Sequence, residues 1–142
     1  MNQQMIKQLA VAAEAVFAPT SVVVAYAFGS RVSGRPLSAS DLDIGYYAAK
    51  DSELVQLSIK EEMTLQGQLS ERMGMDVDLR NLNDAPLDLR GRVLEEGVRL
   101  YSGDEKMRVR IESELLSHYH DYKHAYAEMH RMRLAGFARA GV

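Results

Sequence analysis

The apolar positions of the chain fall into short blocks with different periods, and each period predicts a kind of element. In residues 1–18 they recur at helical spacing and stop before Pro19, which predicts an amphipathic helix. Residues 21–28, SVVVAYAF, form a continuous β-branched run, typical of a strand buried on both faces. Residues 41–47, DLDIGYY, alternate between apolar and polar and predict a second strand.

The middle of the chain predicts a long helix followed by a third strand. Asp51 or Ser52 can cap a helix that runs to Met73, with leucines on its apolar side, and Gly74 is expected to close it. Residues 75–82 then alternate as a strand does.

The last third predicts two more helices around a short edge strand. Residues 87–96 are helical in pattern, Gly97 ends them, and residues 98–101 fit an edge strand. A second long helix is expected over residues 104–133. Its predicted inner stripe is apolar or aromatic and consists of Ile111, Leu115, Tyr119, Tyr122, Tyr126 and Met129. This order of elements predicts an α+β (α/β) fold, a small sheet covered by helices.

Composition limits the class of protein further. With 142 residues the chain is expected to form a single domain over residues 1–142, and its apolar and charged contents are those of a globular protein. The absence of cysteine excludes disulfides and thiolate metal sites and suits a reducing cytoplasm. A net charge of −3 argues against direct nucleic-acid binding, and no apolar run is long enough to span a membrane.

Two aspartates interrupt the apolar pattern of the second strand. Asp41 and Asp43 are two residues apart, so in a strand they project from one face, about 6.6 Å apart along the chain. Leu42 and Ile44 point the other way, into the core. Adjacent carboxylates repel each other unless a cation lies between them, and hard oxygen ligands suit Mg²⁺ or Mn²⁺. The pattern predicts a divalent metal site.

Further candidate groups flank this pair. On the third strand Asp76 and Asp78 share a face, and either could add a ligand; Asp78 is preferred because it lies between Val77 and Leu79, away from the turn at Gly74. Upstream, Gly29 allows close backbone approach and Ser30 offers a hydroxyl and an amide, which together suit a phosphate group. Arg31 could neutralise phosphate charge. Metal carboxylates opposite a phosphate site indicate two-metal phosphoryl or nucleotidyl transfer.

These motifs carry a family resemblance. Gly29-Ser30, ten residues, then Asp41-Leu42-Asp43 resembles the signature of the polymerase β-like nucleotidyltransferase superfamily, and Val77-Asp78-Leu79 resembles the strand with its third carboxylate. Over nearly its whole length the chain is similar to the minimal nucleotidyltransferases (MNT, or MntA). Those proteins are antitoxins paired with HEPN-domain toxins.

The resemblance implies a fold, cosubstrates and roles. It implies the polymerase β-like fold with a small mixed sheet, two Mg²⁺ or Mn²⁺ ions, and ATP as donor of AMP to a hydroxyl. Asp41 and Asp43 would hold both metals, Asp78 would complete one metal site and help to deprotonate the acceptor, and Gly29 and Ser30 would hold the triphosphate. The acceptor would be a hydroxyl, expected to be a tyrosine, of a partner HEPN ribonuclease toxin. The helix over residues 104–133 is a candidate for docking that partner.

Two other functions compete with this hypothesis. A small-molecule nucleotidyltransferase, similar to aminoglycoside-modifying enzymes, would share the fold, but such enzymes carry a further helical domain for which little chain remains beyond Asp104. A non-catalytic antitoxin that only masks its toxin would not need the three aspartates, which destabilise a fold when they serve no purpose.

Overall fold

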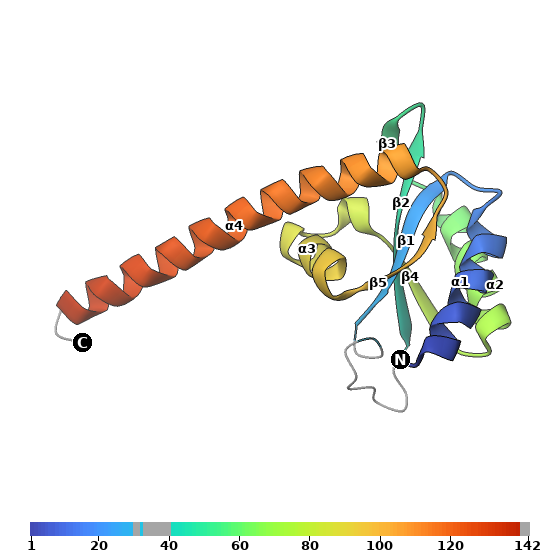
Figure 1. Ribbon diagram of the computed structural model, residues 1–142, viewed down its shortest axis with the longest axis horizontal. Helices are drawn as coiled ribbons and strands as arrows, with labels where there is room; N and C mark the ends of the chain where they lie inside the picture. Colours follow the sequence, from blue (N-terminus) through green and yellow to red (C-terminus); the bar gives the residue numbers. More distant parts are fainter. Residues whose placement is uncertain (30–31, 33–40, 140–142) are drawn as a thin grey trace.

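The computed structural model describes residues 1–29, 32 and 41–139 of the chain. In chain order the elements are α1 (Gln3–Phe17), β1 (Val22–Phe28), β2 (Leu42–Lys50), β3 (Glu53–Val55), α2 (Ile59–Met73), β4 (Val77–Asn81), the 3-10 helix η1 (Leu82–Asp84), α3 (Leu87–Glu96), β5 (Val98–Ser102) and α4 (Glu105–Arg139). Helices pack on both faces of one sheet, and α4 extends away from it (Figure 1). The predicted α+β class is confirmed. Within these described ranges, no helix is both long and apolar enough to cross a membrane.

The sheet is mixed and has β1 near its centre. β1 pairs antiparallel with β2 on one side and with β5 on the other. The first half of β2 pairs parallel with β4, and its last residues pair antiparallel with β3. The buried β-branched run of β1 thus lies between two strands, as its sequence predicts.

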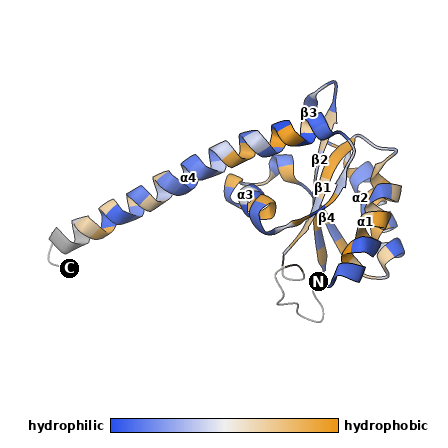
Figure 2. Cartoon of the chain, viewed as in Figure 1, coloured by the Kyte–Doolittle hydropathy of each residue, from blue (hydrophilic) through white to orange (hydrophobic). Residues whose placement is uncertain are grey.

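Alternation along the strands sends successive side chains into two separate cores. Leu42 and Ile44 of β2 lie in the core formed with α1 and α2, whereas Tyr47 lies in the core shared with α3 and α4. The apolar stripes of α1 and α2 face the sheet, and their polar residues face outward (Figure 2). Asp43 and Asp78 therefore project on the same side as α3 and α4.

Most helix ends follow the local capping chemistry of the sequence. The Asn2 side chain accepts from the backbone N–H of Met5 at the start of α1, and Asp104 accepts from Met107 N–H at the start of α4. Gly74 closes α2 with a left-handed φ of 64°.

The predicted helix over residues 51–73 is wrong in its first third. Asp51 and Ser52 have positive φ values of 52° and 64° and form a tight turn between β2 and β3. Such a turn joins two antiparallel strands without splaying them, so Leu54 enters a strand and cannot start a helix. The helix begins at Ile59, where the Ser58 hydroxyl accepts from the N–H of Glu61.

The predicted inner stripe of α4 is correct in its first half only. Ile111, Leu115 and Tyr119 are buried, but Tyr122 is 41% exposed and Tyr126 is 63% exposed. Met129, also in the predicted stripe, is 61% exposed. The reason is geometric: the C-terminal part of α4 extends beyond the sheet and α3 (Figure 1).

Candidate functional site

The site begins with two carboxylates brought side by side by strand pairing. Asp43 and Asp78 are direct partners in the parallel ladder between β2 and β4. Both are half-buried, because their neighbours Leu42, Ile44 and Val77 anchor the strands in the α1–α2 core. The distant aspartates that the sequence proposed as partners are thus adjacent in the fold.

The pKa of Asp43 reflects this placement. Burial raises the pKa of its carboxyl above the ordinary value, and the negative charge of Asp78 raises it further. The Arg80 guanidinium lowers the pKa, and Asp41 adds a smaller raising effect. A carboxylate that is both desolvated and close to like charges gains most from a nearby cation.

The remaining two aspartates lie at the rim of the site. Asp41 is exposed and directly precedes β2, close enough to affect the pKa of Asp43. Asp76 is exposed and precedes β4, where its carbonyl accepts from Leu42 N–H at 2.9 Å. Of the two candidates on the third strand, it is Asp78 that faces Asp43 across the ladder.

Gly29 closes the site on the other side. Its φ is +88°, and a Cβ added there would lie 2.3 Å from Oδ2 of Asp43. Only a residue without a side chain can occupy this position while the Asp43 carboxylate keeps its place. Gly29 thus lies directly against the carboxylate of Asp43. The predicted phosphate ligands Ser30 and Arg31 lie outside the described residues.

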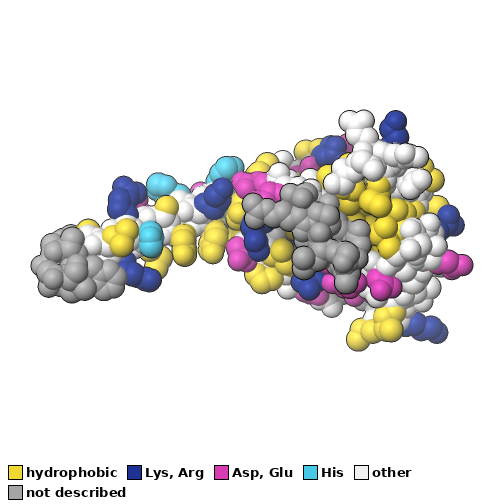
Figure 3. All heavy atoms as spheres, turned by 90° about the horizontal axis from the view of Figure 1, so that it is seen from below, with side chains coloured by type: hydrophobic (Ala, Val, Ile, Leu, Met, Phe, Trp, Pro, Cys, Tyr) yellow, Lys and Arg dark blue, Asp and Glu magenta, His cyan; other side chains and the backbone are white. Residues whose placement is uncertain are grey.

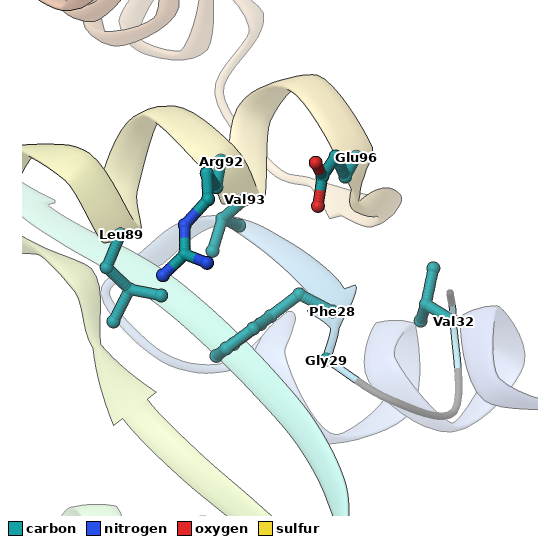
Figure 4. Close-up of a pocket in the computed structure, with 7 residues that line it drawn as sticks. All are labelled: Phe28, Gly29, Val32, Leu89, Arg92, Val93 and Glu96. Atoms are coloured by element: carbon teal, nitrogen blue, oxygen red, sulfur yellow. The ribbon is translucent and has the colours of Figure 1, made fainter. Parts of the chain in front are cut away.

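A pocket opens beside Gly29, between the end of β1 and α3. It has a volume of about 300 Å³, and Phe28, Leu89 and Val93 contribute apolar walls. Arg92 and Glu96 of α3 add one positive and one negative side chain (Figure 4). Because Phe28 is the ladder partner of Asp43, the pocket adjoins the carboxylates.

Two arginines of this region were not singled out by the sequence. Arg80 Nε lies 3.3 Å from Oδ2 of Asp78, and Arg92 lines the pocket. The period of two along β4 places Arg80 on the face of Asp78, so that signal was available. Arg92 carries no such mark, since only the packing of α3 brings it next to Gly29.

The donor set suits a hard divalent cation, although the described residues hold no ready-made cluster of three ligands. Asp43 and Asp78 supply paired carboxylate oxygens, the ligands that Mg²⁺ and Mn²⁺ prefer. Asp41, which directly precedes β2, is a further carboxylate close enough to affect the pKa of Asp43. Chemically, the arrangement can hold a cation between carboxylates next to a glycine that allows close approach of a ligand.

Comparison with known proteins gives a family match and no close curated relative. Residues 13–106 match the model of the family described as polymerase beta, nucleotidyltransferase. This match includes all four aspartates considered above. No curated protein matches the sequence of this chain significantly.

Several solved structures share the fold. One, a toxin–antitoxin with AMP-PNP, is 23% identical with a TM-score of 0.62, over 89% of this chain and 94% of that one. Another, the tri-AMPylated Shewanella oneidensis HEPN toxin in complex with MNT antitoxin, is 23% identical with a TM-score of 0.59, over 93% and 95%. A third, the toxin–antitoxin MntA–HepT, is 24% identical with a TM-score of 0.58, over 92% and 95%. At these identities the likeness is one of fold.

Proposed function

Because the chain belongs to the polymerase beta nucleotidyltransferase family, we propose that it is an antitoxin that transfers AMP from ATP to a HEPN toxin. The observation that carries the proposal is the pairing of Asp43 with Asp78 directly beside Gly29. Paired carboxylates and an unobstructed backbone are what a metal-bound triphosphate requires.

In the proposed reaction the acceptor hydroxyl, expected to be that of a tyrosine, attacks the α-phosphorus of ATP. A new oxygen–phosphorus bond forms, the bond to the β-phosphate breaks, and pyrophosphate leaves. Asp78 takes the hydroxyl proton, while Asp41 and Asp43 would hold two Mg²⁺ or Mn²⁺ ions, with Asp78 completing one site. Those cations, when bound, neutralise charge on the phosphates. Gly29, with Ser30 and Arg31, would hold the triphosphate.

A protein acceptor is supported by the similar solved structures and by the shape of this chain. Structures that share the fold contain toxin–antitoxin pairs, one of them with an AMPylated HEPN toxin. Here α4 extends beyond the sheet and carries exposed apolar side chains along its projecting part, which suits docking of another protein (Figure 3). We assign one face of this part, formed by Tyr122, Tyr126 and Met129, to the toxin, with the exposed Met132 and Leu134 on either side of it.

AMP on the toxin would inactivate it without destroying it. A transferred AMP adds bulk and a negative charge, and either would oppose binding of an RNA phosphate near a ribonuclease centre. Neutralisation would then persist after the two proteins separate, whereas neutralisation by simple masking would end at that point.

The roles of the aspartates can be tested with matched variants. The parent chain and its Asp43→Asn, Asp78→Asn and Asp76→Asn variants are incubated with labelled ATP, Mg²⁺ and the cognate HEPN toxin. Asp43→Asn and Asp78→Asn should lower transfer by about 100-fold or more, as loss of a key electrostatic group does, while Asp76→Asn keeps most of it. Loss in Asp76→Asn with activity in Asp78→Asn would make Asp76 the third ligand. Label on a small molecule and none on the toxin would favour the small-molecule alternative.

A further inference from the structure

Arg92 differs from three arginines that lie near the sheet on the same side. Arg90 Nε donates to the Tyr47 hydroxyl at 3.3 Å, Arg80 pairs with Asp78, and Arg108 pairs with Glu112. Arg92 has no hydrogen-bond or ion-pair partner for its guanidinium among the described residues. An arginine that serves only stability would be expected to pair with the acidic groups common on this surface.

The Arg92 side chain is directed into the pocket beside the carboxylates. Figure 4 shows its guanidinium lying over the pocket between Leu89 and Phe28, while Glu96 lies at the other end near Val32. A positive group at one end and a negative group at the other favour a ligand whose anionic part lies at the Arg92 end. Guanidinium groups bind phosphate through two parallel hydrogen bonds.

The size and walls of the pocket suit the rest of such a ligand. Its volume of about 300 Å³ is at the lower end of the range for small-molecule sites, enough for a nucleoside. The Phe28 ring and the aliphatic chains of Leu89 and Val93 offer apolar surface for a planar base. Because Phe28 pairs with Asp43 in the ladder, a ligand in the pocket would have its phosphates within reach of the carboxylates.

We propose that Arg92 is a nucleotide-binding residue whose guanidinium neutralises phosphate oxygens of the bound nucleoside triphosphate. This inference rests on the proposed function and adds to it a phosphate contact from α3, on the opposite side of the pocket from Gly29. It predicts that Arg92 contributes to the affinity for the phosphate part of the substrate, whatever base is attached.

The test separates phosphate binding from other roles by comparing two ligands. Dissociation constants for ATP and for inorganic triphosphate, each with Mg²⁺, are measured calorimetrically for the parent, Arg92→Gln and Arg92→Lys, and the rate of AMP transfer is measured for the same chains. Arg72→Gln is the control, since Arg72 lies in α2 on the opposite face of the sheet. Arg92→Gln should weaken both ligands by the same factor, about tenfold, the value expected for one charged hydrogen-bonded contact. Arg92→Lys should lose less affinity for both ligands, and Arg72→Gln should bind both as tightly as the parent.

Three results would overturn the inference. ATP affinity unchanged in Arg92→Gln would remove Arg92 from the site, and a lower transfer rate at unchanged affinity would place it against the acceptor protein. Weaker ATP binding with unchanged triphosphate binding would make it a contact to the nucleoside. If the parent itself bound neither ligand, the proposed function would fail as well, a result distinct from the other three.

Discussion

Gly29 and the carboxylate of Asp43 lie so close together that a side chain at residue 29 would displace the carboxylate. The φ of Gly29 lies at +88°, and its Cα faces Oδ2 of Asp43 at a distance that leaves no room for a Cβ. Under the proposed function, the close approach of Gly29 that would admit a phosphate would also fix the position of Asp43 as a metal ligand. A side chain at residue 29 should therefore lower both the stability of the fold and the activity.

Replacement of Gly29 with alanine should lower both the free energy of unfolding and the rate of AMP transfer. The left-handed backbone costs roughly 1–3 kcal/mol in a residue with a side chain, and the new methyl group would displace the Asp43 carboxylate. Gly67→Ala is the matched control, because Gly67 lies within α2 with nothing within 4 Å of an added Cβ. The free energy of unfolding of that control should rise by about 0.5–1 kcal/mol, because alanine favours a helix more than glycine does. Urea unfolding and the rate of AMP transfer are measured on both variants; equal stability and activity in the two would contradict this role for Gly29.

Individual residues of the site could be predicted from the sequence where a short-range pattern marks their positions. The period of two identified Asp43 and Asp78 as chemistry-bearing positions on two strands, and the structure makes them ladder partners. Which strands become neighbours depends on long-range packing, so the contact itself could not be derived from spacing. For the same reason the pocket residue Arg92 escaped notice: nothing local distinguishes it from a solvated helix residue.

The elements were predictable to the extent that local chemistry decides them. Gly97 and Pro19 mark helix boundaries that the structure keeps, because a flexible glycine or a proline without an N–H ends a helix within one turn. The helix expected from residue 51 failed because apolar residues in β3 can satisfy a helical period by coincidence. The turn at Asp51 and Ser52, with φ positive at both residues, prevails over their capping propensity.

The start of α4 is held by a cluster of charged groups. Glu105 accepts from the Ser102 hydroxyl and from the Arg108 guanidinium, which also pairs with Glu112. These hydrogen bonds, that of Arg108 first, lower the pKa of Glu105 to about 2. The negative charge also lies at the positive end of the helix dipole.

The stability of this helix start should therefore depend on pH in a defined window. A lowered pKa means that the folded state favours the charged form, so the contribution of Glu105 is present above pH 4.5 and is lost as pH falls towards 2. Glu105→Gln should unfold more easily than the parent at pH 7, and the difference should shrink below pH 4.5. Urea unfolding across this range measures it. Glu114→Gln, an exposed carboxylate further along α4, should change stability little at pH 7. A difference that grew on acidification would contradict the assignment.

As a whole, the molecule is a covered sheet with one helix that continues beyond it. α4 is 35 residues long, about 50 Å, but its buried side chains end at Tyr119. Beyond this point stacked rings continue along the helix, with centroids 6.4 Å apart from Tyr122 to Tyr126 and from Tyr126 to His130. The projecting half thus contributes surface rather than core.

Removal of the projecting half should separate binding from folding. A chain ending at residue 120 keeps all the buried side chains of α4 and should retain the urea midpoint of the parent. Under the proposed function it should lose affinity for the HEPN toxin, as should the full-length Tyr126→Glu variant. Size-exclusion chromatography and calorimetry with the toxin measure this loss. Val11→Glu, at an exposed apolar residue of α1, is the control and should bind normally. Normal toxin binding by the truncated chain would place the interface elsewhere.

The mass of the toxin after coexpression tests the central claim most directly. The cognate HEPN toxin is purified after coexpression with the parent chain or with Asp43→Asn, and its intact mass and ribonuclease activity are measured. The account predicts AMP adducts and lasting loss of ribonuclease activity with the parent, and an unmodified toxin that regains activity after separation from Asp43→Asn. An unmodified toxin that both chains silence equally would contradict AMP transfer and leave masking as the function.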